Sequence, residues 1–255
     1  MQNSKAAAVI LTFNEENNVA NAVTNASQYF EDVFVLDSLS TDNTVAKAKE
    51  AGAKVFENKF EDYASQRNCA LEKLKADYDW VFFLDADEEL NEELGKNVQY
   101  ITSKQPNKQI AYEMKRINHF LGQPLNYTVG PDYQTRLLGK FDELEYFSKV
   151  HERLNLEKEQ IKQVSGHIIH KDVSSMQYLF NKTNYQSDLE VEQRKLYSLP
   201  HSVFRLLNVP IRTFLSHYVM KRGFLDGYRG FLYSYHKGVY RAVIISKQIE
   251  KLLQK

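Results

Sequence analysis

The first hundred residues alternate between short apolar runs and longer segments in which apolar residues recur at helical spacing. The apolar runs predict buried strands at 6–12, 33–36, 54–56 and 80–84. The segments between and after them predict helices at 17–29, 41–51, 60–74 and 91–103. This alternation is typical of βαβ units, so we predict a doubly wound α/β sheet with helices on both faces.

The pattern changes after residue 105. Residues 110–170 combine short strand-like runs with turns that contain glycine or proline, and from residue 174 onward the apolar spacing is helical. Pro200 and Pro210 are expected to bracket a break in this helical region, because proline cannot donate the backbone hydrogen bond of a helix interior. We therefore predict one domain over 1–172, with parts 1–105 and 106–172, followed by a helical extension over 173–255.

Composition favours a globular protein of a reducing compartment. Of the 255 residues, 43% are hydrophobic and 26% are charged, and Cys69 is the single cysteine, so no disulfide can form within the chain. The N-terminal residues lack the charged-then-apolar pattern of a secretory signal. Apolar runs such as 80–84 fall far short of the ~20 residues that span a bilayer. The expected location is cytoplasmic.

A net charge of zero hides an uneven distribution along the chain. Residues 1–100 contain 9 Lys and Arg against 19 Asp and Glu, whereas residues 201–255 contain 10 against 2. The basic segment also carries many Phe, Tyr and Leu residues, which is typical of a helix that lies in a membrane interface. We expect an anionic membrane surface as its partner, with peripheral attachment, and no nucleic acid. The alternative is a tail that packs on the catalytic domain or on a second subunit in a homo-oligomer.

Two carboxylates one residue apart follow the fourth predicted strand. Asp85 and Asp87 come directly after Phe82-Phe83-Leu84. Ligands of doubly wound sheets bind beyond the carboxyl ends of the strands. Hard divalent cations prefer oxygen ligands and leave room for substrate phosphates. The pair therefore predicts a cation and diphosphate site, and the alternative is two solvated acids at a strand end.

Polar clusters also follow the first and second predicted strands. They read Thr12-Phe13-Asn14-Glu15 and Asp37-Ser38-Leu39-Ser40-Thr41-Asp42. The first glycine of the chain is Gly52, which argues against the glycine-rich phosphate loops of Rossmann and Walker motifs. Side chains at these strand ends suit hydrogen bonds to a base or ribose, although Asn14 could equally cap a helix. Arg67, in Ala64-Ser65-Gln66-Arg67-Asn68, is early enough in its helix to meet an anion.

Taken together, in this order and spacing, these four motifs resemble the family 2 glycosyltransferases of the GT-A type. The resemblance covers residues 6–100 closely and 110–245 more loosely. It implies the Rossmann-like doubly wound mixed sheet of that fold, with nucleotide-sugar binding in 1–105 and acceptor binding and catalysis in 106–172. It implies a ribose or sugar contact from Asp85 and a metal contact from Asp87, with Mg²⁺ or Mn²⁺ as cofactor. The nucleoside contacts that it implies come from Thr12, Asn14, Glu15, Asp37 and Arg67.

Segments 130–138, 150–154, 167–170 and 223–230 resemble the subgroup that adds sugars to the lipopolysaccharide inner core. That resemblance implies inverting transfer of a hexose from a UDP-linked donor to a glycolipid or oligosaccharide acceptor. Inversion needs one base for the acceptor hydroxyl, for which Asp132 is the first candidate and Glu152 the second. Many family members carry Glu where this chain has Pro131, which leaves that choice open. His170 is a further candidate ligand of the metal.

Other functions stay open at this point. A nucleotidyltransferase also uses a doubly wound sheet and acidic metal ligands, but it normally needs a glycine-rich loop, which the first strand lacks. The acceptor could belong to another surface polysaccharide or to a glycoprotein. A non-catalytic, membrane-associated protein that binds nucleotide sugars is the third alternative. The presence of Asp85, Asp87 and Asp132 together favours an enzyme.

Overall fold

The computed structural model describes residues 4–130, 132–147, 153–173 and 175–254. The chain forms two compact units, of which the first comprises 1–116 and 133–170 and the second comprises 117–132 and 171–255. Each unit has its own cluster of buried apolar side chains. The second unit therefore takes in a segment of the predicted domain 1–172 as well as the predicted extension.

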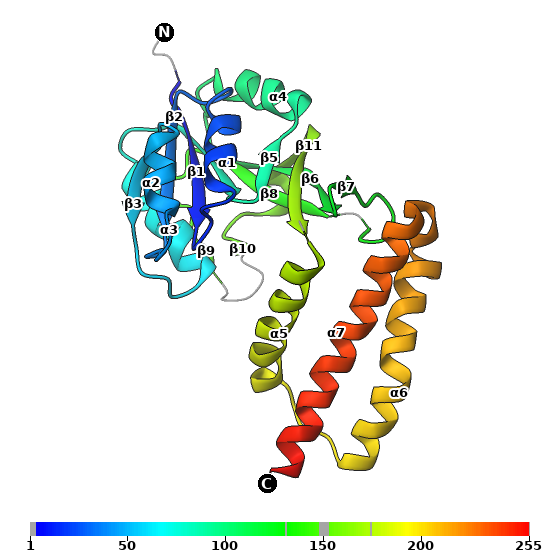
Figure 1. Ribbon diagram of the computed structural model, residues 1–255. Coiled ribbons are helices and arrows are strands. Elements are labelled where there is room, and N and C mark those ends of the chain that lie inside the picture. Colours follow the sequence, from blue (N-terminus) through cyan, green and yellow to red (C-terminus); the bar gives the residue numbers. More distant parts are fainter. Residues whose placement is uncertain (1–3, 131, 148–152, 174, 255) are drawn as a thin grey trace. The chain divides into compact units, whose positions relative to one another are not determined.

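Four parallel strands form one half of the sheet, as predicted. They are β1 (Ala6–Thr12), β2 (Asp32–Asp37), β3 (Lys54–Glu57) and β4 (Trp80–Asp85). The sheet continues through β8 (Tyr133–Gly139), β6 (Ile110–Phe120), β11 (Ile161–Val173) and β5 (Glu88–Leu90). In this part β8 pairs antiparallel with β4 and β6, and β11 pairs antiparallel with β5. The resulting order is β3-β2-β1-β4-β8-β6-β11-β5, which confirms the doubly wound, mixed α/β sheet (Figure 1).

Helices cover both faces of this sheet because adjacent residues of a buried strand point in opposite directions. In β1, Ala8 and Ile10 pack with α1 (Val19–Ala26), α2 (Thr44–Glu50) and α4 (Glu92–Thr102). Ala7 and Val9 pack with α3 (Tyr63–Leu74) on the other face. The four predicted helices are thus confirmed, although each is shorter than its predicted span.

Side-chain caps fix where two of these helices begin. The Asn91 side chain accepts a hydrogen bond of 3.0 Å from the backbone N–H of Leu94 at the start of α4, which confirms the cap expected there. Asp62 does the same for α3 by accepting from the N–H of Ser65 at 2.8 Å. The true start of α3 is therefore Tyr63, three residues after the predicted one.

Short elements complete the first unit. A two-stranded sheet forms from β9 (Tyr146–Phe147) and β10 (Arg153–Leu154), and a 3₁₀ turn, η1 (Lys158–Gln160), precedes β11. In the second unit, β7 (Gln123–Pro124) pairs with the end of β6.

The second unit is largely helical, as the sequence predicts for this region. It contains α5 (Met176–Gln193), α6 (Leu199–Leu215), the π-helical turn η2 (Ser216–Met220), the 3₁₀ turn η3 (Gly223–Asp226) and α7 (Gly227–Leu253). Across the described ranges, each helix is too short or too polar to pass through a bilayer.

The prediction that Pro200 and Pro210 bracket a break is wrong, because both prolines lie in one continuous helix, α6. Pro200 lies in the first turn of α6, where its missing N–H costs nothing, but Pro210 lies inside that helix. Close packing accompanies this proline: a Cβ on Gly238 of α7 would sit 2.9 Å from the Pro210 carbonyl oxygen. The contact between α6 and α7 is therefore tight enough at this point to require glycine.

One carboxylate anchors the loop at 126–128 to the helices of the second unit. Asp226 accepts hydrogen bonds from the backbone N–H groups of Asn126, Tyr127 and Thr128 at 2.9, 3.1 and 2.8 Å. It also accepts one from the Thr128 hydroxyl at 2.6 Å. These four hydrogen bonds connect the loop at 126–128 to η3, although the two segments are far apart in the sequence.

Candidate active site

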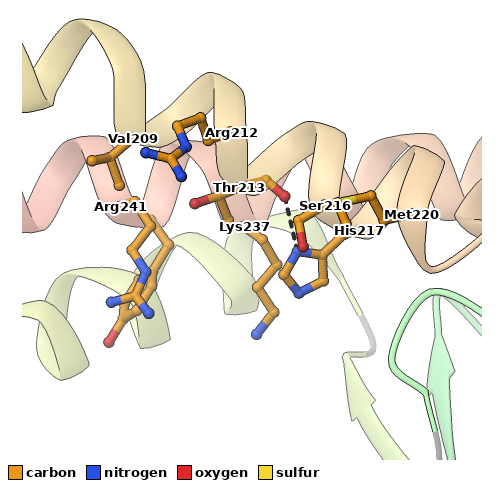
Figure 2. A pocket seen from close by; sticks show the side chains of 9 residues that line it. Val209, Arg212, Thr213, Ser216, His217, Met220, Lys237 and Arg241 are labelled. Carbon is orange, nitrogen blue, oxygen red and sulfur yellow. Dashed lines mark hydrogen bonds between the residues drawn. The ribbon is translucent and has the colours of Figure 1, made fainter.

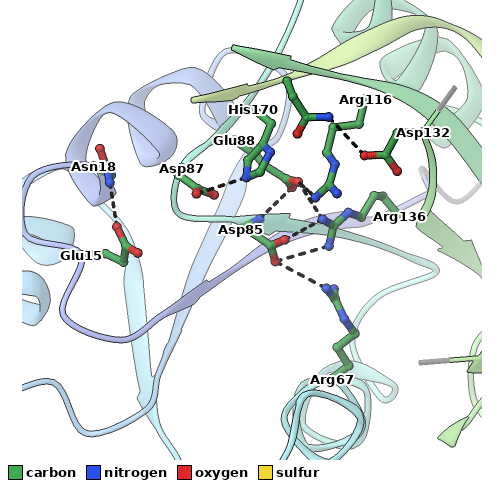
Figure 3. Close-up of polar contacts among 11 residues, drawn as sticks. Glu15, Asn18, Arg67, Asp85, Asp87, Glu88, Arg116, Asp132, Arg136 and His170 are labelled. Carbon is green, nitrogen blue, oxygen red and sulfur yellow. Dashed lines mark hydrogen bonds and ion pairs between the residues drawn. The ribbon is translucent and has the colours of Figure 1, made fainter. Parts of the chain in front are cut away.

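Asp85 lies at the carboxyl end of β4 and is bound by two arginines from different elements (Figure 3). Arg136 of β8 donates to its two carboxylate oxygens at 3.3 and 2.6 Å. Arg67 of α3 donates to Oδ1 at 3.4 Å. A third of the Asp85 side chain still reaches solvent, whereas both arginine side chains are almost fully buried. The carboxylate is thus held in a fixed orientation at the edge of the sheet.

The two arginines decide the charge of Asp85. Burial favours the neutral acid, but Arg136 and then Arg67 outweigh it and hold the pKa of Asp85 well below its usual range. Burial likewise opposes the charge of Arg136, and Asp85 with Glu88 more than compensates, which raises the pKa of Arg136. Asp85 is therefore a permanent anion that suits hydrogen bonding and not proton transfer.

Glu88 is a member of this cluster that the sequence did not single out. Its side chain is fully buried and accepts hydrogen bonds from Arg136 at 2.8 Å and from Arg116 at 3.2 Å. Its other oxygen accepts the backbone N–H of Asp85 at 3.1 Å. The buried Glu88, the partly exposed Asp85 and the arginines therefore neutralise one another around the end of β4, which limits the cost of burying the charges of Glu88 and Arg136.

Asp87 and His170 lie together, as their assignment to one metal site requires. Nε2 of His170 is 3.2 Å from Oδ2 of Asp87, and both side chains are largely buried. The antiparallel pairing of β5 with β11 sets His170 opposite Glu88, next to Asp87 (Figure 3). A carboxylate oxygen and an imidazole nitrogen are thereby brought to one point beside the Asp85 cluster.

Asp87 and His170 together fit a divalent cation whose remaining ligands are waters and substrate oxygens. Within the described ranges, no group of three or more His, Cys, Asp and Glu side chains is arranged to hold a metal. Mg²⁺ usually binds through one or two carboxylates, several waters and substrate phosphates, and imidazole also suits transition metals such as Mn²⁺. Asp87 and His170 match that partial protein shell.

The loops after β1 and β2 are tied to each other by side chains predicted to contact a nucleoside. Asp37 is fully buried and accepts the Thr12 hydroxyl at 2.8 Å and the N–H and hydroxyl of Ser40 at 2.7 and 2.6 Å. Asn14, with φ of 55°, donates its N–H to the Ser40 hydroxyl at 2.8 Å and accepts the Thr41 N–H at 2.9 Å. These contacts hold the rim of the sheet, and the nucleoside roles of Thr12, Asn14 and Asp37 stay predictions.

Glu15 and Arg67, the other predicted nucleoside contacts, have protein partners as well. Glu15 accepts a 2.7 Å hydrogen bond from the Asn18 side chain, and its N–H donates to the Thr44 hydroxyl at 2.7 Å. The Arg67 guanidinium lies 5.0 Å from the Phe83 ring centroid, in addition to its bond with Asp85. Arg67 therefore belongs to the Asp85 cluster in this structure.

Asp132, the first candidate for the base, lies in the second unit at the residue before β8. Its Oδ2 accepts a hydrogen bond of 3.4 Å from the Asn118 side chain. The second candidate, Glu152, lies outside the described residues. The choice between them stays open.

Two solved structures share a limited similarity with this chain. A structure of glucosyl-3-phosphoglycerate synthase from Mycobacterium tuberculosis with Mn²⁺, UDP and glucosyl-3-phosphoglycerate has a TM-score of 0.45 at 15% identity, over 66% of this chain and 72% of that one. The Mg²⁺ and UDP complex of that enzyme has a TM-score of 0.37 at 19% identity, and the match spans 46% of this chain and less than half, 44%, of that one.

Sequence comparison shows the family. "Uncharacterized glycosyltransferase RP128" of Rickettsia prowazekii is 31% identical over 240 residues, which cover 89% of this chain and 81% of that protein. Residues 7–146 match the family model described as glycosyl transferase family 2. The chain belongs to glycosyl transferase family 2. It is a glycosyltransferase with the GT-A fold.

Proposed function

We propose that this enzyme transfers a hexose from a UDP-linked donor to a glycolipid acceptor such as lipopolysaccharide core, with inversion and with Mg²⁺ or Mn²⁺. Membership of the family supports the glycosyl transfer itself. The lipid-linked acceptor is supported by segments 130–138 and 223–230, which resemble the inner-core subgroup. The observation that carries the proposal is the contact between Asp87 and His170 beside the arginine-bound Asp85.

Each group at the end of β4 has a separate task in this proposal. Asp87 and His170 hold the cation, which supplies positive charge to the diphosphate of the donor and its leaving group. Asp85 is kept ionised by Arg136, so it accepts hydrogen bonds from donor hydroxyls without taking up a proton. The loop network of Thr12, Asn14 and Asp37 shapes the place for the nucleoside.

Asp132 removes the proton from the acceptor hydroxyl as that oxygen attacks the anomeric carbon, and the bond between this carbon and the diphosphate breaks to release UDP. A carboxylate is suited to act as this base because inverting transfer needs one base and forms no covalent intermediate with the enzyme. The hydrogen bond from Asn118 orients the carboxylate. Glu152 is the alternative base.

The second unit is the proposed membrane contact. Val203, Leu207, Ile211, Leu215 and Val219 recur at every fourth residue through α6 and η2, and their exposed fractions lie between 44% and 66%. Met220, Lys221 and Arg222 come next in the sequence and are also exposed. Apolar side chains beside cations suit the interface of an anionic bilayer, where a glycolipid acceptor resides.

A donor and acceptor screen tests the proposal. The protein with Mn²⁺ is incubated with UDP-, GDP- and CMP-linked sugars, first alone and then with lipopolysaccharide core acceptors, and nucleotide release and glycolipid products are measured. We expect slow hydrolysis of a UDP-hexose and faster release with the acceptor, with a product of inverted anomeric configuration by NMR. No nucleotide release from any of the sugars would indicate a binding protein. Transfer only to another polysaccharide or to a protein would show that the proposed glycolipid acceptor is wrong.

Asp87→Asn and Glu92→Gln form a matched pair for this assay. Both substitutions remove one carboxylate charge, but Glu92 lies on the surface of α4 and pairs with Lys96. We expect Asp87→Asn to lose transfer and Glu92→Gln to retain it. Equal activity of the two variants would contradict the assignment of the site.

A further inference from the structure

Glu88 connects three groups of the candidate site, although the proposed reaction assigns it no task (Figure 3). Its backbone lies opposite that of His170 in the antiparallel pairing of β5 with β11. Asp87 is the residue directly before it, and its own side chain accepts a hydrogen bond of 3.1 Å from the backbone N–H of Asp85. The two proposed metal ligands and the arginine-bound acid therefore meet at one residue of the sheet.

The bond between Glu88 and Asp85 closes a short turn. Strand β4 ends at Asp85 and β5 begins at Glu88, so Ala86 and Asp87 alone connect the two strands. Oε2 of Glu88 accepts the N–H of the residue three positions earlier. Such a local bond between a side chain and the backbone holds the turn in one conformation. Because both ends of the turn are held, the direction of the Asp87 side chain is restricted as well.

The Glu88 carboxylate is itself held from two further strands. Its Oε1 accepts hydrogen bonds from Arg136 of β8 at 2.8 Å and from Arg116 of β6 at 3.2 Å, and the side chain has no solvent exposure. Donors from two strands leave the carboxylate little freedom to rotate. A buried ionic cluster often gives no more stability than apolar packing would, so its presence at the end of β4 favours a role in geometry.

We propose that Glu88 is a positioning residue, which holds the turn at 85–88 so that Asp87 faces His170. This inference rests on the proposed metal role of Asp87 and His170. Groups that orient metal ligands act without contacting the metal, and their loss typically weakens metal binding by about 10–100-fold. Glu88 occupies such a place, since one of its oxygens binds the turn and the other binds two arginines.

Glu88→Gln tests this role because the side chain keeps its size. A glutamine amide has one oxygen that accepts and one NH₂ group that donates. The oxygen should stay with the two arginines, since hydrogen bonds from charged donors are the stronger ones. The NH₂ group then faces the N–H of Asp85, where two donors cannot bond, and the turn is released. We expect this variant to bind Mn²⁺ in the presence of UDP at least about tenfold more weakly than the intact protein, as measured by calorimetry.

Glu190→Gln is the matched control. Glu190 also accepts hydrogen bonds from two arginines, Arg194 and Arg241, but it lies in α5 of the second unit. Its third donor is the Tyr240 hydroxyl, at 2.5 Å. Figure 2 shows Arg241 where it lines a pocket between α6, η2 and α7. Each substitution removes one carboxylate from two arginines, so Glu190→Gln should bind Mn²⁺ and UDP as the intact protein does.

Leu74→Ala controls for a loss of stability in the first unit. Leu74 is buried at the end of α3, in an apolar cluster that contains none of the candidate ligands. The cavity that the substitution leaves should lower the melting temperature, without changing the Mn²⁺ affinity well below that temperature. If Glu88→Gln gave the same result, a lower melting temperature and an unchanged Mn²⁺ affinity, its role would be structural and the proposal would be overturned.

NMR signals of the His170 ring separate this inference from the proposed function. Mn²⁺ bound at His170 should broaden them in the intact protein, and Glu88→Gln should need at least about tenfold more Mn²⁺ for the same broadening. Broadening at equal Mn²⁺ concentrations in both proteins would overturn the role of Glu88 alone. No broadening in the intact protein would remove the metal site and this inference with it.

Glu88→Asp replaces Glu88→Gln if the latter does not fold. It keeps the negative charge beside the arginines, but its side chain is one methylene shorter and cannot reach both the arginines and the N–H of Asp85. The same weakening of Mn²⁺ binding is expected, and an affinity equal to that of the intact protein would overturn the proposal.

Discussion

Nε2 of His170 lies 3.2 Å from Oδ2 of Asp87, although Asp87 lies in the turn between β4 and β5 and His170 lies far along the chain in β11. The contact depends on the register between β5 and β11, since a shift by one residue would turn His170 to the other face of the sheet. The proposed ligand pair of Asp87 and His170 therefore depends on the fold and not on either motif alone.

The first prediction concerns the metal. We expect Asp87→Ala to abolish transfer, because it removes the anionic ligand, and His170→Ala to raise the Mn²⁺ concentration needed for half-maximal activity by about 10–100-fold. Both are measured by Mn²⁺ titration of activity and of UDP binding. Unchanged Mn²⁺ dependence in His170→Ala would remove His170 from the site, and near-normal turnover of Asp87→Ala would refute the metal assignment.

The second prediction concerns the buried charges around Asp85. Arg136→Met leaves Asp85 and Glu88 without their shared partner and should reduce the free energy of unfolding by about 3–5 kcal/mol. Urea unfolding measures it. Arg153→Met, at an exposed position of β10, is the control and should change stability little. A loss below 1 kcal/mol in Arg136→Met, roughly the level of a surface pair, would contradict this role.

The pH dependence of stability follows from the same cluster. The folded pKa of Asp85 is depressed, so its contribution is fully present above the ordinary pKa of about 3.8 and is lost as pH falls through the folded value. Removing Arg136 should bring the folded pKa of Asp85 up. We therefore measure the free energy of unfolding of Arg136→Met from about pH 3 to about pH 7, where carboxyl groups titrate. At the acidic end of this range, it should depend less steeply on pH than that of the intact protein. An unchanged slope would show that Arg136 does not set the charge of Asp85.

The third prediction concerns the base. Asp132→Asn keeps the shape and the contact with Asn118 but cannot accept a proton, so turnover should fall by about 10²–10⁴-fold while donor binding stays within a few-fold of wild type. Steady-state kinetics and donor titrations separate the two quantities. Glu152→Gln, made in parallel, should retain most of the turnover. The opposite result would assign the base to Glu152.

The fourth prediction concerns the exposed apolar residues of α6. Leu207→Gln with Ile211→Gln should weaken sedimentation with anionic liposomes, because two apolar groups leave the bilayer interface. Phe60→Gln with Tyr100→Gln replaces exposed apolar residues of the first unit and should have no such effect. Salt should reduce binding of the intact protein by screening its cations. No binding of the intact protein at low salt would refute membrane contact.

The sequence could predict the elements that have a strong local signal. Strands β1 and β4 are continuous apolar runs, and the cap at Asn91 has its own residue preference, so both were predictable. The two acids at the end of β4, Asp85 and Asp87, also predict a binding site from the sequence alone, and that assignment stays a prediction. In contrast, β5 has three residues, too few for a period to be visible.

Partners across the sheet could not be predicted in the same way. The bonds of Arg136 to Asp85 and Glu88 depend on how β8 pairs with β4, and no local pattern encodes that register. Pro210 is a second example of a position at which local preference fails. Helix propensity disfavours a proline inside a helix, but the close packing of α6 against Gly238 of α7 overrides that preference.

The four hydrogen bonds that Asp226 accepts from 126–128 have a consequence for protein engineering. A chimera that exchanged only 171–255 between two relatives would place this loop against a turn from the other protein. The backbone N–H groups of 126–128 would then lose the carboxylate that accepts their hydrogen bonds. The exchangeable module is discontinuous and must carry 117–132 together with 171–255. Since Asp132 ends the first of these segments, a graft that alters the helices also replaces the sequence around the candidate base.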